Sequence, residues 1–171
     1  MNLTISSAEI APKVEPANVI PCTDWASVLL ETAIEVFATM AHATVSARKD
    51  SAPQPEHLVT ALVGIAGAIR AKIILKGRRE SAAQLALQMI GIAPEDPGAA
   101  KAALDAFGEM GNILAGYFKA KVGLGDACKL SVPTIIAGGS YQFRSSGSFE
   151  RIELSLQYEE EPLWLTLEVA R

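Results

Sequence analysis

The most informative stretch of the sequence is residues 104–116, which read Leu-Asp-Ala-Phe-Gly-Glu-Met-Gly-Asn-Ile-Leu-Ala-Gly. At the 100° per residue of an α-helix, the large apolar side chains of this region gather on one side. They are Phe107, Met110, Leu114 and Phe118. The other side carries a narrow stripe, because residues three and four apart share a helix face. The stripe consists of Asp105, Glu109, Asn112 and Gly116. We therefore predict a helix with one face on a core and a polar stripe turned to solvent.

Three glycines interrupt this predicted helix, at Gly108, Gly111 and Gly116. Each of them costs a helix roughly 0.5–1 kcal/mol relative to alanine. Such a cost indicates that something must come close to the helix, either the sheet beneath it or a partner molecule. Gly111 leans toward the apolar side and Gly116 lies in the stripe, so both explanations stay open.

The composition is that of an ordinary globular protein. The chain has 171 residues, of which 50% are hydrophobic and 20% charged, which is enough for one domain with a core. A net charge of −4 gives no basic footprint for nucleic acid. The most apolar run, residues 58–69, is too short to span a bilayer, and no secretory signal begins the chain. We expect a cytoplasmic protein without nucleic-acid or membrane partners.

Local patterns divide the chain into an extended arm over residues 1–21 and a single domain over residues 22–171. Helices are expected from Thr23 or Asp24 to Ala41, from Arg78 or Ser81 to Gly91, and from the loop at 94–98 to about Gly123. Strands are expected over 57–76, as a hairpin turning at 64–67, and over 129–137, 140–143, 148–158 and 163–169. The predicted fold class is α/β (α+β), with long helices on a largely antiparallel sheet.

A weak internal repeat relates two of these helices. Leu30-Glu31-x3-Glu35-x2-Ala38 aligns with Leu104-Asp105-x3-Glu109-x2-Asn112, and an apolar hairpin is expected after each copy. The repeat predicts a pseudo-two-fold arrangement in which both helices lie on the sheet with their stripes outward. The first copy has Ala38 where the second has Asn112, so only the second keeps a complete polar stripe.

The second copy, with the sequence after it, resembles the CheC/CheX/FliY family of chemotaxis phosphatases. The family pattern is an Asp or Ser, a Glu four residues on, an Asn three after that, and a Pro at the start of the next strand. These positions are Asp105, Glu109, Asn112 and Pro133. A single complete motif in the second copy, with a degenerate first one, is most similar to the CheX branch.

The resemblance implies hydrolysis of the aspartyl phosphate on a CheY-type response regulator. Asn112 would orient the attacking water, and Glu109 would pair with a lysine of the receiver. Asp105, Gly108 and Gly116 would contact the partner. The receiver would supply Mg²⁺, so no cofactor or metal of the protein's own is expected. CheX-like proteins pair through continuous sheets, and the alternating strands at the end of this chain predict a homodimer through a sheet edge.

Other interpretations of these residues stay open. Glu109 can be a solvated side chain, and Asp105 can simply pair with Lys101. Tyr117 and Phe118 are expected in the core, and Cys22 and Cys128 lack metal-type spacing and are expected as reduced thiols. The alternative function is a non-enzymatic module that binds a response regulator or belongs to a flagellar switch. The middle domain of FliM has this architecture without the Glu/Asn pair.

Overall fold

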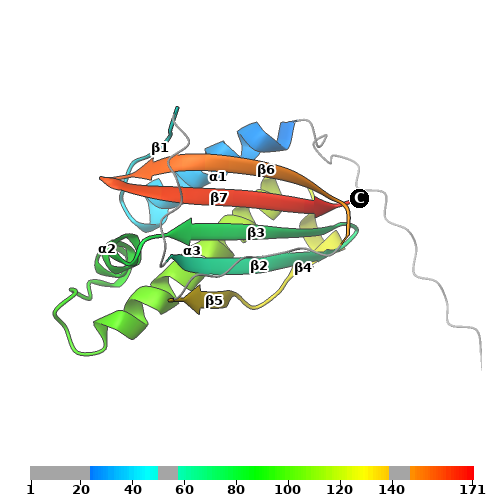
Figure 1. Cartoon of the computed structure of the whole chain (residues 1–171). Coiled ribbons are helices and arrows are strands. Elements are labelled where there is room, and N and C mark those ends of the chain that lie inside the picture. The colour runs from blue at the N-terminus through cyan, green and yellow to red at the C-terminus, as the bar shows by residue number, and fades with distance from the viewer. Residues whose placement is uncertain (1–23, 50–57, 139–146) are drawn as a thin grey trace, which may run out of the picture.

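The structure, a computed structural model, describes residues 24–49, 58–138 and 147–171. Within these ranges the chain forms three α-helices and a seven-stranded sheet (Figure 1). The helices are α1 (Trp25–Met40), α2 (Arg79–Ile90) and α3 (Ala99–Lys121). The strands are β1 (Val45–Ala47), β2 (Val59–Gly67), β3 (Arg70–Gly77), β4 (Cys128–Leu130), β5 (Thr134–Ala137), β6 (Phe149–Tyr158) and β7 (Glu161–Ala170). A 3₁₀ turn, Gly125–Ala127, precedes β4.

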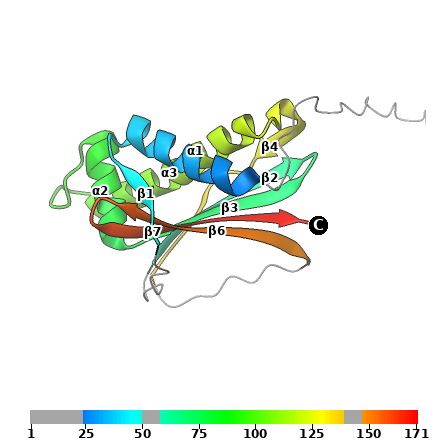
Figure 2. The same ribbon diagram turned by 90° about the horizontal axis from the view of Figure 1, so that it is seen from above.

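The sheet has the order β1-β6-β7-β3-β2-β4, and β5 also pairs with β2. Every pair of neighbours is antiparallel. Figure 2 shows α1 and α3 lying across the same face of this sheet, with α2 at one end of it. The predicted fold class, helices on a largely antiparallel sheet, is confirmed. The pseudo-two-fold repeat stays a prediction.

Apolar side chains at helical spacing pack α1 and α3 against the sheet. In α3 the predicted apolar positions Phe107, Met110, Leu114 and Phe118 are all fully buried. The core side of α1 is buried as well, and the Trp25 ring meets Phe118 edge-on at 5.6 Å between centroids. Each large apolar side chain removed from water contributes roughly 1.5–3 kcal/mol. This burial fixes which face of α3 remains outside, and so where the polar stripe lies.

Two predicted element boundaries were wrong, and one strand was missed. The hairpin turns at Ala68 and Ile69 rather than at residues 64–67, and Gly64 lies inside β2 opposite Lys72. The predicted strand 129–137 breaks into β4 and β5 around Pro133, which has no N–H to donate to the ladder. The short strand β1 was not predicted. It pairs with the end of β6, so its three residues are defined by a distant partner rather than by a local pattern.

Two further predictions need correction. Tyr117 is 38% exposed rather than buried, because it follows the stripe around α3 instead of facing the sheet. The final strand β7 lies between β6 and β3, so it is not a sheet edge. Three predictions fall outside the described residues: the arm at 1–21, the strand at 140–143 and the reduced thiol of Cys22.

Candidate functional site

The stripe predicted from the sequence lies on the outer side of α3. Asp105 and Glu109 are exposed, and Asn112 and Gly116 are partly exposed. The helix itself spans Ala99–Lys121 without a break, since its other face is anchored by buried apolar side chains. A rigid helix of this kind holds Glu109 and Asn112 one turn apart on a common face. The structure therefore brings together the two residues predicted to be catalytic.

The acidic residues of the stripe differ in their partners. Asp105 forms an ion pair with Lys101 one turn earlier, the structural interpretation that its spacing allowed. In the described part of the chain, neither Glu109 nor Asn112 makes a hydrogen bond or ion pair with another side chain. A carboxylate and a carboxamide left without internal partners can bind an external cation and hold a water molecule.

The three glycines of α3 lie in different surroundings. A Cβ at Gly108 would lie 2.6 Å from Cδ1 of Ile135 on β5, and one at Gly111 would lie 3.0 Å from Cβ of Ala61 on β2. Both are buried, so the close packing of helix on sheet explains them. This placement favours packing over the predicted partner contact at Gly108. At Gly116 the nearest atom would be 3.9 Å away, which leaves room for something outside the chain to approach.

Pro133, the Pro of the family pattern, lies beside α3, where the sheet is interrupted between β4 and β5. Ser131 Oγ accepts a hydrogen bond from the Gly64 amide at 2.9 Å, and the Ser131 amide donates to the Gly64 carbonyl oxygen at 2.9 Å. The chain then swings out through Val132, which is 86% exposed, and returns at Pro133, within 3.9 Å of a Cβ built at Gly108. Pro133 thus packs near the stripe, and Val132 presents an apolar side chain to solvent.

A groove that sequence reasoning missed continues from Asn112 along the helix. It measures about 590 Å³ and runs past Gly116 and Tyr117 to Lys121. Its other wall includes Glu35 of α1, whose carboxylate lies 2.6 Å from Lys121 Nζ. The contact joins residues far apart in the sequence, so no local spacing signals it. Glu35 and Asn112 therefore line one groove.

Among residues 24–49, 58–138 and 147–171, no three His, Cys, Asp or Glu side chains are grouped as metal ligands would be. Cys128 is a buried free thiol. No helix in these ranges combines the length and apolar character needed to cross a membrane.

Comparison with known proteins identifies the class to which this fold and stripe belong. The family model described as "Chemotaxis phosphatase CheX" matches residues 59–157. The chain is 32% identical over 108 residues to the protein named "CheY-P phosphatase CheX" from Thermotoga maritima, covering 63% of this chain and 68% of that protein. This chain belongs to the CheX family of chemotaxis phosphatases.

Solved structures share the fold at lower identity. The chemotaxis protein CheX from Vibrio vulnificus superposes with a TM-score of 0.69 at 20% identity, covering 84% of this chain and 95% of that one. The CheX of the "CheX-CheY-BeF3-Mg+2 complex" from Borrelia burgdorferi also gives a TM-score of 0.69, at 18% identity, with 86% and 99% covered. These likenesses cover a larger share of the chain than residues 59–157, which match the family model.

Proposed function

We propose that this protein hydrolyses the aspartyl phosphate of a CheY-type response regulator. The observation that carries the proposal is the Glu109–Asn112 pair, which lies on the exposed side of α3 in the spacing typical of the family. A relative with 32% identity is named a CheY-P phosphatase, and a structure of similar fold is described as a CheX–CheY complex. Both support a response regulator as the partner.

Asn112 is assigned the catalytic role. An acyl phosphate is hydrolysed by a water molecule that attacks the phosphorus in line with the leaving carboxylate oxygen. The short carboxamide of Asn112 carries both a donor and an acceptor, so it can hold that water in place without becoming its base. Placing the water removes much of the entropy that the reaction in solution must lose.

Glu109 is assigned to docking. Its exposed carboxylate lies one turn before Asn112, where it can form a charge-assisted hydrogen bond with a lysine of the receiver. That contact would fix the register in which Asn112 meets the phosphoryl group. Asp105 and Gly116 extend the same face, Asp105 at its rim and Gly116 as the point of closest approach.

The remaining chemistry belongs to the partner. The receiver would bring the phospho-aspartate and the Mg²⁺ ion that neutralises charge on the phosphoryl oxygens. The Borrelia complex is described as containing Mg²⁺ and a beryllofluoride together with CheY, in agreement with this division. A buried free thiol at Cys128 fits a reducing compartment, and we propose a cytoplasmic location.

The test is dephosphorylation of radiolabelled receivers. Candidate CheY-type receivers would be phosphorylated with a small-molecule phosphodonor, and the loss of label would be followed with and without this protein. We expect catalytic amounts of the protein to accelerate the loss for its cognate receiver. Saturable binding without acceleration, for every receiver that binds, would replace the phosphatase by a non-enzymatic regulator-binding module.

We also propose a homodimer through the sheet edge. The outer side of β6 is paired with β1 only near Leu156, Gln157 and Tyr158, and no described strand pairs with residues 149–154 there. An exposed run of backbone donors and acceptors is a ready surface for a second strand. Light scattering should give twice the monomer mass at micromolar concentrations, whereas a monomeric mass throughout would exclude this assembly.

A further inference from the structure

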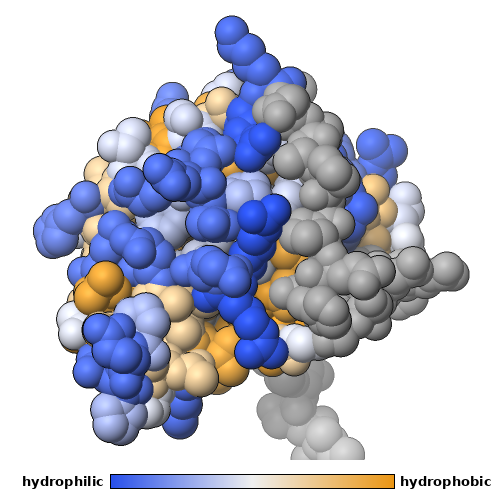
Figure 3. Space-filling view, turned by 60° about the vertical axis from the view of Figure 1, so that its left-hand side comes forward, coloured by the Kyte–Doolittle hydropathy of each residue, from blue (hydrophilic) through white to orange (hydrophobic). Residues whose placement is uncertain are grey.

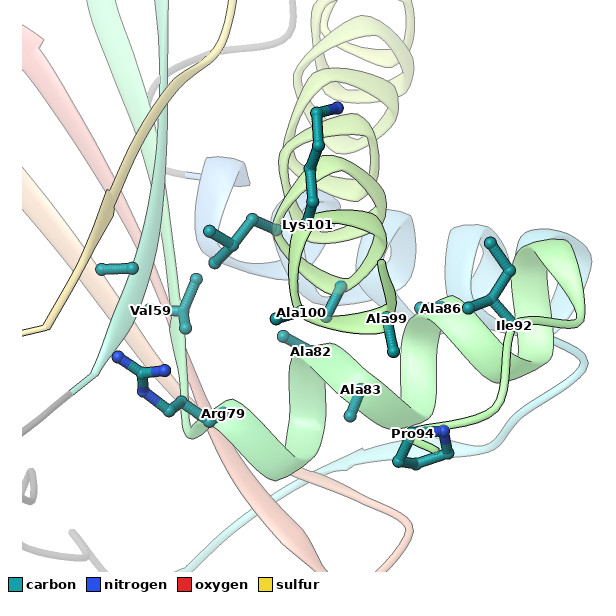
Figure 4. Close-up of a pocket in the computed structure, with 13 residues that line it drawn as sticks. Val59, Arg79, Ala82, Ala83, Ala86, Ile92, Pro94, Ala99, Ala100 and Lys101 are labelled. Atoms are coloured by element: carbon teal, nitrogen blue, oxygen red, sulfur yellow. The ribbon is translucent and has the colours of Figure 1, made fainter. Parts of the chain in front are cut away.

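A second cavity lies between α2 and the first turns of α3, away from Asn112. It measures about 580 Å³, within the range of pockets that hold small organic ligands. Figure 4 shows alanine side chains from the two helices facing one another across it, with Val59 of β2 at its inner side. The helical lining includes Ala82, Ala83, Ala86, Ala99, Ala100 and Ala103.

The size of these side chains explains why the cavity exists. The two helices are packed against each other, yet the alanines at most of their lining positions leave the space between them unfilled. Larger apolar residues at the same positions would close the space and add buried surface. Figure 3 turns the α2 side of the molecule forward and shows apolar surface open between hydrophilic groups. An apolar body that occupied the cavity would be sheltered from water without any rearrangement of the fold.

The charge at the rim of the cavity is positive. Arg79 is the first residue of α2, and its side chain lies beside Val59 in Figure 4. In the described part of the chain, Arg79 has no ion pair. The other cations nearby do have one, Arg78 with Glu161 at 3.6 Å and Lys101 with Asp105. Arg79 is therefore the cation that remains available to a ligand in the cavity.

We propose that this cavity binds a small amphipathic carboxylate. The hydrocarbon body would lie between the alanine-lined faces of α2 and α3, and the carboxylate would accept hydrogen bonds from the planar guanidinium of Arg79. Size, apolar lining and the guanidinium of Arg79, which has no ion pair among the residues that the structure describes, together select this ligand class over a neutral or cationic one. The proposal does not depend on the phosphatase activity, because Glu109 and Asn112 do not line this cavity.

The test uses the full chain and decanoate as the probe, below its critical micelle concentration, in isothermal titration calorimetry. Arg79→Gln should weaken decanoate binding about tenfold, as expected for loss of a charge-assisted hydrogen bond. Binding of decan-1-ol, which has the same chain without the charge, should be weaker in the parent and unchanged by Arg79→Gln. Arg70→Gln, at an exposed position on β3, is the matched control and should leave both affinities unaltered.

A second variant addresses the apolar part of the site. Ala83→Trp places an indole in the cavity from a partly exposed position of α2, and circular dichroism would confirm that the helices remain. It should abolish saturable binding of both probes. The proposal is wrong if the parent shows no saturable decanoate binding. It is equally wrong if Arg79→Gln and Arg70→Gln weaken binding alike, or if Ala83→Trp binds like the parent.

Discussion

The helices α1 and α3 lie on the same face of the sheet and are aligned by the predicted repeat, yet their outer faces differ in two respects. On α3, Glu109 has no ion-pair partner among the described residues and stands one turn from an amide. On α1, the corresponding Glu35 is paired with Lys121, and the amide position is Ala38. An acidic helix face is thus not sufficient for a site. An unpaired carboxylate next to an unpaired amide is the feature that separates the two helices.

The outer faces of α1 and α3 are not independent surfaces. Glu35 and Asn112 line the same groove, so α1 forms a wall beside the proposed site of α3. If α1 once carried a second site, as the predicted repeat implies, its acidic residue Glu35 now forms an ion pair within the fold. The contrast between α1 and α3 then predicts how strongly each stripe residue affects activity.

The largest effect is expected at the amide. Asn112→Ala should lower the rate of receiver dephosphorylation about 10²-fold or more, the scale for losing one transition-state contact. The fold and receiver affinity should hardly change, because among the described residues Asn112 makes no hydrogen bond or ion pair with another side chain. The measurement is kcat with radiolabelled phospho-receiver, together with receiver affinity in the absence of turnover.

Glu31→Ala provides the control for this change. Glu31 is an exposed residue on α1, outside the groove, and its loss should leave the rate at the parental value. If the Asn112→Ala variant dephosphorylates the receiver as fast as the Glu31→Ala variant does, Asn112 does not have the proposed catalytic role.

A smaller effect is expected at the acid. Glu109→Ala removes the proposed contact with the receiver's lysine, so it should weaken docking and raise KM about tenfold, as for loss of one charge-assisted hydrogen bond. Because the contact sets the register of Asn112, some loss of kcat should accompany it. Steady-state kinetics over a range of receiver concentrations separates the two. An unchanged KM would remove Glu109 from the docking surface.

Substitutions at the glycines of α3 are expected to change the stability of the protein rather than the rate of dephosphorylation. Gly116→Ala should stabilise α3 by about 0.5–1 kcal/mol, because its Cβ would meet Cδ1 of Leu130 at an unstrained 3.9 Å and alanine is the better helix former. Gly111→Ala should lack this gain, because the new Cβ meets Ala61 of the sheet. Urea unfolding should then separate the two variants by at least about 0.5–1 kcal/mol.

The same pair distinguishes packing from partner approach. If Gly116 marks the point where a receiver comes closest, Gly116→Ala should raise KM while the protein becomes more stable. A gain in stability with no change in KM would assign Gly116 to the helix alone. Equal stability of the two alanine variants would contradict the packing explanation of Gly111.

The sequence predicted the parts of this fold that repeat a local pattern. The 3.6-residue periodicity of residues 104–118 located α3, its buried face and its stripe, because helical neighbours are three and four positions apart. Gly91 ended α2 as predicted, in the left-handed conformation at a φ of 70°. The alternation in residues 148–169 likewise located β6 and β7.

Long-range contacts were beyond the reach of such patterns. Where the chain leaves β4, Ser131 bonds to Gly64 across the sheet, and β1 pairs with the end of β6. The groove at Asn112 depends on Glu35 meeting Lys121. These contacts join segments whose separation along the chain carries no periodic signal, so only the folded structure reveals them.

The smallest effect is expected at Glu35, and it bears most directly on the difference between α1 and α3. The Glu35–Lys121 pair is about half exposed on the Glu35 side, and surface pairs of this kind contribute about 0–1 kcal/mol. Glu35→Ala should therefore change stability little, and it should leave kcat almost unchanged, because Ala38 offers no group to orient a water. Lys121→Ala removes the same ion pair from the α3 side and serves as the matched variant, to be compared in the same dephosphorylation and urea-unfolding measurements. A loss of activity as large as that of Glu109→Ala, seen for Glu35→Ala but not for Lys121→Ala, would show that the first helix still takes part in the reaction and that the two stripes act together across the groove.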